Sequence, residues 1–570
     1  MPVGLAQRGG LALRRFFDHV DPVLFAAMVV GLLLRAWQFG AIPPGLNQDE
    51  ASTAYDAFSL IHYGVDRNGF RFPVVLVSWG SGMYALASYV EAPFIGLFGL
   101  SVWSARLPFL LIGLAALPLF YRLLRDTTDR RTARIGVALL AVSPWHVMVS
   151  RWGLDCNVLP FALLLATVLL VRSAARPRSL VWAALVFGLA LYAYGTAYLV
   201  VPVFLALALF HGVRRRLWPV RTMLWAGATF ALVALPIGLF VAINSLRWDS
   251  IRTPILSIPH LTGVPRFRTM GNLQVFSAEF VRQAVANLGQ AAELFRSQDD
   301  GLIWNAIPGY GILYGFSTLL ALAGLALLVG KSLGKARQSS FPLLAWAVAA
   351  MVLMAFVAPN LNRANAAMLP FIFCVAIASS LLWQYRPLAI LLCALLAGSL
   401  AGFVGAYFGN YRQTAAGPFF ASFGEAIRYA SDQTRGEVCV TDHVNMPYIF
   451  VLFYNQEDPR LFERTVRYDN PGAEFQSVSS FGRYRFGLGR CADAASVIVA
   501  SPDEVGALGR EHFIVKEFER YVVLLRPDRD TNVGALPASP AEPPGKPRSQ
   551  ALADDATTGI AHAASRTAHE

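Results

Sequence analysis

Two adjacent carboxylates, Asp49 and Glu50, stand shortly after the first long apolar segment of the chain. At a membrane surface, such a carboxylate can take the proton from an acceptor hydroxyl or amine as a new bond forms. The same stretch also fits a helix N-terminus, because Asn47 and Glu50 have the spacing of a capping box and acids in a first turn favour the helix dipole. A catalytic pair and a helix cap are both open interpretations.

Further polar clusters lie in the connections between later apolar segments. Charged residues at membrane depth or at its edge are costly, so each cluster is a candidate for function. One cluster, in a hairpin between two apolar segments, contains an arginine and the acid Asp155. A second hairpin contains two further residues, and a long loop contains three. The basic and amide side chains concerned are, in chain order, Arg151, His260, Arg266, Arg268, Asn362 and Arg363.

Carboxylates beside arginines at a lipid boundary suit one reaction type. An arginine can stabilise the charge that develops on a lipid-phosphate leaving group through paired hydrogen bonds. A carboxylate can take the proton of the acceptor. Together these residues predict sugar transfer from a lipid-phosphate donor. Hydrolysis by two carboxylates is a competitor, but a hydrolase has no need of many membrane spans.

Simpler explanations exist for most of these side chains. Arg151 and Arg363 can snorkel to the surface or pair with an acid, and the three loop residues can be ordinary solvated side chains. Arg35 and Arg106, near the outer ends of their spans, are better explained as anchors or as partners of acids. Aromatic residues such as Trp79 are expected in an interface belt or in packing, although one or two can line a groove.

The composition indicates a polytopic membrane protein. Of the 570 residues, 55% are hydrophobic and 15% are charged, which is too apolar for an ordinary soluble protein. The net charge of +12 comes from short basic clusters between apolar segments, so these clusters indicate topology and not a nucleic-acid partner. The cysteines lack the spacing of a zinc or iron–sulfur site, and a disulfide between Cys439 and Cys491 stays open.

Loop charges decide the expected topology. The apolar run 82–99 contains Glu91 and Pro93, and counting it as a span would put every later basic loop on the wrong side, so it is expected at the outer surface. The rest gives about eleven spans, with the N-terminus cytoplasmic and the C-terminus outside. The expected spans are residues 23–39, 103–124, 135–150, 156–171, 180–197, 198–212, 222–243, 312–330, 340–357, 366–384 and 387–408.

Three regions are expected along the chain. Residues 1–409 should form a transmembrane domain, with a first outer loop at 41–102 that carries juxtamembrane helices and a second large outer loop at 244–311. Residues 410–525 should form a small extracytoplasmic α/β domain, and residues 526–570 a disordered tail. Within the α/β domain, the patterns predict a helix at 419–435 and strands at 438–441, 496–500 and 521–525.

With these residues in view, the chain resembles the bacterial relatives of protein O-mannosyltransferases and the aminoarabinose transferase of lipid A, which are multi-spanning GT-C glycosyltransferases. The resemblance covers about the first 410 residues of the chain. It rests on Asp49-Glu50 followed by residues 51–55, on residues 105–108, on Ser150-Arg151 with Asp155, and on Asn362-Arg363 ahead of Pro370.

The resemblance implies a GT-C-like fold, a polyprenyl-phosphate sugar donor, a site under the first outer loop and inversion at the anomeric carbon. Asp49 is carried over as the base, with Glu50 supporting it and Asp155 as a second acidic position. The arginines, His260 and the amide named above are expected to contact the donor phosphate or the substrate. Neither a cofactor nor a divalent metal is expected. One departure stands out, because the lysine that such transferases carry in this loop has no counterpart between Asn47 and Gly82.

The expected partners are the lipid-linked donor, membrane lipids and a protein, lipid or polysaccharide acceptor, in a multi-pass protein of the cell (inner) membrane. Two other function classes stay open. A flippase or transporter of lipid-linked sugars should line a path across the bilayer with polar residues and often shows repeats. A non-catalytic scaffold that binds envelope glycan would use the acids only as a helix cap.

Overall fold

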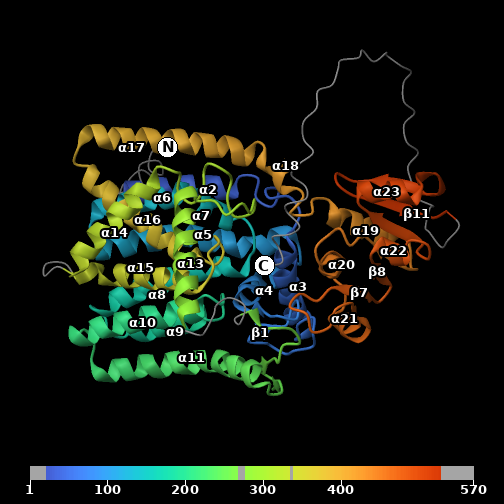
Figure 1. Cartoon of the computed structure of the whole chain (residues 1–570), viewed down its shortest axis with the longest axis horizontal. Helices are drawn as coiled ribbons and strands as arrows, with labels where there is room; N and C mark the ends of the chain where they lie inside the picture. The colour runs from blue at the N-terminus through green and yellow to red at the C-terminus, as the bar shows by residue number, and fades with distance from the viewer. Residues whose placement is uncertain (1–20, 267–276, 334–337, 528–570) are drawn as a thin grey trace, which may run out of the picture. The chain divides into compact units, whose positions relative to one another are not determined.

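The computed structural model describes residues 21–266, 277–333 and 338–527. The described part is mostly helical up to residue 408 and contains a mixed sheet after residue 437, as Figure 1 shows. The prediction of a helical membrane protein with a small sheet-containing C-terminal region is confirmed. Arg268 and all but the first two residues of the predicted tail lie outside the described residues.

Among the described residues, six apolar segments are long enough to cross a membrane. They are α5 (Val102–Thr127), η1 and α8 (Asp155–Ser173), α10 (Ala197–Arg214), α11 (Val220–Leu246), η3 and α16 (Asn365–Leu382) and α17 (Arg386–Phe408). Shorter apolar helices are α2 (Pro22–Ala36), α4 (Leu86–Phe98), α9 (Ser179–Ala190), α14 (Ser317–Leu333) and α15 (Phe341–Phe356). The count of about eleven crossings and the surface placement of α4 stay predictions.

The stretch 135–150, expected as one span, is not one continuous helix. Two helices, α6 (Arg130–Val142) and α7 (Pro144–Val149), occupy this stretch. Ser143 between them has an extended backbone at φ −62°, ψ 121°, and its hydroxyl accepts the N–H of His146. The break has a local cause, because a residue that precedes proline is disfavoured in the helical region and Pro144 then begins the next helix.

The first outer loop carries α3 (Gln48–Tyr63), whose start fits the predicted cap. The Asn47 side chain accepts the N–H of Asp49 at 3.0 Å, and the Glu50 side chain accepts the N–H of Asn47 at 3.4 Å. The helix ends at Gly64, which has a left-handed backbone with φ 71°. Most of α3 is buried, between α4 and the C-terminal region, so its polar residues are interior ones.

A hairpin follows in the same loop and connects three parts of the chain. Its strands are β1 (Val75–Leu76) and β2 (Met83–Tyr84), and we call residues 77–82 the hairpin loop. The Gly263 N–H binds the Gly80 carbonyl at 2.9 Å, and the Arg266 N–H binds the Ser81 carbonyl at 3.1 Å. These bonds come from the second outer loop, which also contains β3 (Ile251–Arg252), β4 (Ser257–Ile258) and the amphipathic α13 (Ala278–Ser297).

The C-terminal region is built on a seven-stranded sheet of order β10-β11-β9-β5-β8-β7-β6. The expected helix and strands are present as α19 (Phe423–Gln433), β5 (Val438–Val440), β9 (Val497–Ala500) and β11 (Val522–Leu525). β5 runs parallel to both of its neighbours. The other elements are α18 (Tyr411–Ala415), α20 (Pro447–Asn455), α21 (Pro459–Thr465), α22 (Leu488–Cys491), α23 (Pro502–Leu508), β6 (Arg467–Tyr468), β7 (Val478–Phe481), β8 (Tyr484–Phe486) and β10 (Ile514–Glu517).

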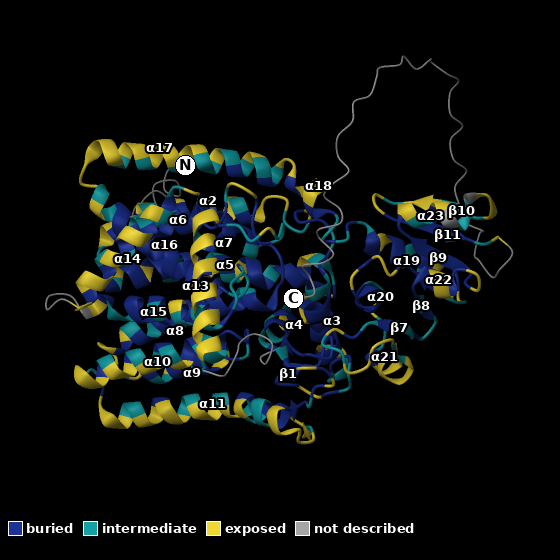
Figure 2. Cartoon of the chain, viewed as in Figure 1, coloured by how far each residue is buried: buried dark blue, intermediate teal, exposed yellow. Residues whose placement is uncertain are grey.

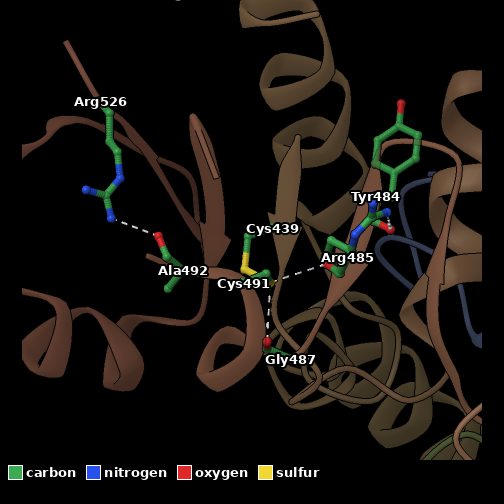
Figure 3. The surroundings of a disulfide bond; sticks show 7 residues. All are labelled: Cys439, Tyr484, Arg485, Gly487, Cys491, Ala492 and Arg526. Atoms are coloured by element: carbon green, nitrogen blue, oxygen red, sulfur yellow. Dashed lines mark hydrogen bonds between the residues drawn. A yellow bond between two sulfur atoms is a disulfide. The ribbon is translucent and has the colours of Figure 1, made fainter. Parts of the chain in front are cut away.

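A disulfide joins Cys439 of β5 to Cys491 of α22, with the two Cα atoms 5.5 Å apart (Figure 3). The pairing that the sequence left open is therefore present. It ties the central strand to a helix 52 residues further along the chain. Since structural disulfides persist in oxidising compartments, the bond supports the expected outer location of this region.

Candidate active site

Asp49 lies in the first turn of α3 and is half-buried. Its Oδ1 accepts a hydrogen bond from the indole Nε1 of Trp79 at 3.0 Å. Its Oδ2 accepts no hydrogen bond from another described residue. The N-terminal end of a helix favours a negative charge. The carboxylate is thus held on one side and available on the other.

Glu50, the neighbouring acid, is enclosed and bound on both oxygens. Arg106 contacts Oε1 through Nε at 2.6 Å and Oε2 through Nη2 at 2.8 Å. The Gly153 N–H donates to Oε1 at 2.8 Å. A Cβ at Gly153 would stand 2.9 Å from the Phe109 ring, so this close approach requires glycine. Glu50 is thus fixed beside Asp49, and its supporting part in catalysis stays a prediction.

Arg106 of α5 completes this support, as expected for a partner of an acid. Its remaining donors bind the carbonyls of Pro43 at 2.7 Å and Gly45 at 2.8 Å. One guanidinium therefore joins α5, the segment before α3 and the first turn of α3. Burying such an ion pair costs desolvation free energy. When all of its hydrogen bonds are formed, the pair fixes the relative positions of the two side chains.

Arg151 donates its hydrogen bonds within the protein, and its expected contact with the donor phosphate stays a prediction. It is fully buried, and its guanidinium donates to Tyr407 and to several main-chain carbonyls, among them Arg35 at 2.7 Å and Gln38 at 3.0 Å. The carbonyls of Leu34 and Arg35 belong to the last turn of α2, where helix carbonyls lack helical partners. Because its donors are used in this way, we do not carry Arg151 forward as a phosphate ligand.

Asp155 lies buried at the start of η1. Its Oδ1 accepts the N–H of Cys156 at 2.7 Å, while its Oδ2 has no hydrogen-bond partner among the described residues. The charges of Arg266 and Asp49 both act on this carboxyl group. The two acids therefore belong to one electrostatic cluster although they are far apart in the sequence.

Two arginines complete the cluster. The charge of Arg266 interacts with Asp155, and the Arg266 guanidinium lies 5.4 Å from the centre of the Phe475 ring. Arg363 is half-buried, with one hydrogen bond from its side chain to the Ala358 carbonyl at 3.3 Å. Tyr194 interacts with the charges of Asp155, Arg266 and Arg363, so the two arginines share these surroundings. Charge interactions thus link Asp155 with Asp49 and Arg266, and link Tyr194 with Asp155, Arg266 and Arg363.

Two predicted residues lie at the edge of this cluster or away from it. Asn362 is in the turn next to Arg363, where Asn360 Oδ1 accepts the Arg363 N–H at 2.8 Å. His260 lines a separate cleft of about 520 Å³ together with Trp248 and Tyr468. Arg268 is outside the described residues, so its predicted phosphate contact stays a prediction.

Trp79, which was expected only in an interface belt, in packing or in a groove, contacts Asp49 directly. Besides binding Asp49, its ring lies 4.9 Å from the Arg67 guanidinium. The Arg67 N–H binds Asp56 Oδ1 at 3.1 Å, and Arg67 Nη2 donates to Ser52 at 2.8 Å. Arg67, Asp56 and Ser52 thus form a buried polar layer that contacts Trp79, the residue that holds Asp49. A tryptophan in an outer loop fits an interface belt equally well, so the sequence held no specific signal for this role.

Asp66 is the second buried acid of this layer. Its Oδ1 accepts the N–H groups of Asn68 and Phe70, both at 2.9 Å. Burial and the charge of Asp56 raise the pKa of Asp66 to about 7. Burial also raises the pKa of Asp56, against the opposing effect of Arg67. Burial thus disfavours the charged form of both acids.

A possible cation-binding group lies elsewhere, on the sheet-containing region. Ligand atoms of Asp442, His443 and Glu504 fall within 4.8 Å of one another. His443 Nδ1 is also 3.3 Å from the carboxylate of Asp503. This group is distinct from the Asp49 cluster, and the expectation that sugar transfer needs no metal stays a prediction.

The helical domain, the first outer loop and the sheet-containing region together define a multi-pass membrane protein with a GT-C-like fold. The solved structure of ArnT from Cupriavidus metallidurans bound to undecaprenyl phosphate is similar in fold, with a TM-score of 0.53 and 14% identity over 91% of this chain and 98% of that one. Its apo form gives a TM-score of 0.51 with the same identity and coverage.

Residues 85–240 match the family described as dolichyl-phosphate-mannose-protein mannosyltransferase. Two Bacillus subtilis relatives are "Putative mannosyltransferase YycA", 32% identical over 120 residues, and "Putative mannosyltransferase YkcB", 35% identical over 113 residues. These matches cover 20% and 19% of this chain and only 17% and 16% of the relatives. The resemblance to GT-C glycosyltransferases is confirmed. The family match includes Arg106 and Asp155 but does not reach Asp49.

Proposed function

We propose that this chain is a GT-C membrane glycosyltransferase that moves a sugar from a polyprenyl-phosphate donor to an extracytoplasmic acceptor, with inversion at the anomeric carbon. The observation that carries the proposal is the state of Asp49. Its carboxylate is held by the Trp79 indole, is supported through the neighbouring Glu50–Arg106 pair, and keeps one oxygen available. A base in an inverting transfer needs this combination of fixed orientation and a free lone pair.

In the proposed reaction Asp49 takes the proton of the acceptor hydroxyl or amine while that atom attacks the anomeric carbon. The bond from that carbon to the phosphate oxygen breaks, and the lipid phosphate leaves with its electron pair. Arg266 and Arg363 are the proposed contacts of the departing phosphate, because the charge of Arg266 interacts with Asp155, the charges of both arginines interact with Tyr194, and guanidinium groups match phosphate geometry. Asp155 would hold the sugar or the acceptor through its unpartnered oxygen.

The polyprenyl carrier is supported by the ArnT structure, whose bound lipid is undecaprenyl phosphate. The likeness to ArnT reaches nearly the full length of that protein, but at 14% identity it shows the fold alone. The sugar and the acceptor are therefore left to experiment. The outer orientation of the site is part of the proposal, and the disulfide of the C-terminal region supports it.

The test uses the purified full-length protein, undecaprenyl-phosphate-linked mannose, glucose and aminoarabinose as donors, and cell-envelope material from cells lacking the protein as acceptor. Release of undecaprenyl phosphate and labelling of the acceptor are measured. Asp49→Asn should slow transfer by about a hundredfold or more, as expected when a positioned base is lost. Asp432→Asn, which changes an exposed acid of α19, is the matched control and should keep full activity.

The outcomes separate the three function classes. Transfer by the native protein that Asp49→Asn leaves undiminished would overturn the role of Asp49. Movement of a labelled donor between the leaflets of proteoliposomes, without transfer, would indicate a flippase. Binding of envelope glycan with neither activity would indicate a scaffold.

A further inference from the structure

A groove of about 480 Å³ separates the start of α17 from the rest of the helical domain. Residues of α6 and α16 form one wall, and Leu392, Cys393 and Leu396 of α17 form the other. A second hollow of about 580 Å³ continues along α17 past Cys393 to Arg386. α17 is a long apolar helix whose side chains are mostly exposed or half-buried, as Figure 2 shows. Such a surface in a membrane faces lipid chains.

The groove and the second hollow are lined by basic residues near the starts of two helices, α6 and α17. Arg131 of α6 and Arg386 at the start of α17 are both exposed, and neither forms an ion pair with another described residue. Arg134 also lines the groove, but Asp21 holds its guanidinium at 2.9 Å. Trp383 borders both hollows, and tryptophan is enriched at the level of lipid head groups. The groove is therefore apolar along its length and basic at its mouth.

This basic end is remote from the proposed active site. Tyr407, near the other end of α17, accepts a hydrogen bond from Arg151 at 3.1 Å, next to the residues that support Asp49. At the rise of an α-helix, Arg386 and Tyr407 are about 30 Å apart, close to the thickness of the hydrocarbon core. The groove mouth thus lies near the membrane face opposite the Asp49 cluster.

We propose that this groove is a binding site for an anionic phospholipid. One acyl chain lies between α17 and the wall made by α6 and α16, and the phosphate lies between Arg131 and Arg386. Basic pockets between membrane helices attract anionic head groups, and each arginine near the surface adds to that attraction. The bound lipid would hold α17, whose most apolar part is only 11% buried by protein, against the domain. The inference does not depend on the proposed sugar transfer.

The first test is native mass spectrometry of the full-length protein with phosphatidylglycerol and phosphatidylcholine of equal chain length. The protein should bind phosphatidylglycerol about tenfold more tightly than phosphatidylcholine, because two arginines attract the anionic head group. The double variant Arg131→Gln/Arg386→Gln should bind both lipids alike. Arg176→Gln, which changes an exposed arginine in the turn after α8, is the matched control and should keep the preference.

The thiol of Cys393 reports where the lipid binds. It is exposed and lines both hollows, whereas Cys156 and Cys374 are buried and the other two cysteines form the disulfide. In the native protein, bound phosphatidylglycerol should slow the reaction of Cys393 with a maleimide about tenfold, which matches the expected tenfold binding preference. In the double variant, phosphatidylglycerol should not slow this reaction.

Three results would overturn the proposal. Equal retention of the two lipids would show that the groove does not select an anion. A preference that persists in the double variant would place the anion site elsewhere. Displacement of phosphatidylglycerol by an equal concentration of undecaprenyl phosphate, with protection of Cys393, would assign the groove to the sugar carrier.

Discussion

The Trp79 indole donates a hydrogen bond to Asp49 Oδ1 at 3.0 Å while its ring covers the Arg67 guanidinium. One side chain therefore orients the proposed base and closes the buried polar layer beneath it. Its backbone carbonyl also accepts the N–H of Gln476 at 2.8 Å, so the same residue touches the C-terminal region.

Trp79→Phe should keep the aromatic surface over Arg67 but remove the indole donor. We expect kcat to fall about tenfold, the value of one hydrogen bond, with KM and thermal stability nearly unchanged. Steady-state kinetics with a lipid-linked donor and thermal unfolding of the same preparations measure both effects. A fall in unfolding temperature that accounts for the lost activity would contradict the positioning role.

Glu50 and Arg106 should behave as a coupled pair. Glu50→Gln leaves a buried guanidinium without its carboxylate and should lower the free energy of unfolding by about 3–5 kcal/mol. Arg106→Gln should have a similar effect, and the double variant should lose less than the sum of the two. Unfolding in detergent measures the coupling energy, and additive losses would show that the pair does not act as a unit.

Asp66 should make stability depend on pH in a specific direction. Because burial raises its pKa from 3.8 to about 7, the folded protein binds a proton that the unfolded chain has released, so stability falls as pH rises from about 4 to about 7. The stability of Asp66→Asn relative to the native protein should therefore rise by about 1–4 kcal/mol between pH 4 and pH 8. Thermal unfolding at the two pH values tests this, and a relative stability that does not rise would refute it.

The disulfide should stabilise the C-terminal region. Replacing Cys439 and Cys491 together by alanine should lower the free energy of unfolding by about 2–4 kcal/mol, as for a loop of 52 residues. Cys393→Ser, which changes an exposed thiol, is the control and should leave stability unchanged. Thiol labelling in whole cells adds a topology test, since reduced Cys439 and Cys491 in the native protein would contradict an outer location.

Local features of this structure were predictable from the sequence, and long-range ones were not. The cap of α3 follows from Asn47 and Glu50, which are three residues apart, and the strands at β5, β9 and β11 follow from short apolar runs. The break at Ser143 was visible in Pro144 but was outweighed by the apolar run around it.

The candidate site shows the same limit. Asp49 and Asp155 were identified by residue type and place, and the structure puts them in one cluster. The use of Arg151 as a main-chain anchor depends on carbonyls that only the folded chain brings near it. Trp79 likewise meets Asp49 only after the hairpin has folded back over α3. No local sequence pattern predicts the contacts of Arg151 or of Trp79.

The hairpin loop has a consequence for biogenesis. Its backbone is bound by Gly263 and Arg266 of the segment between α11 and α13 and by Gln476 of the sheet-containing region. A chain that stops before residue 476 would still insert its apolar helices but would lack the last bond that holds Trp79 in place. The contacts that hold Trp79 against Asp49 would then be complete only after the sheet-containing region has been made and has folded.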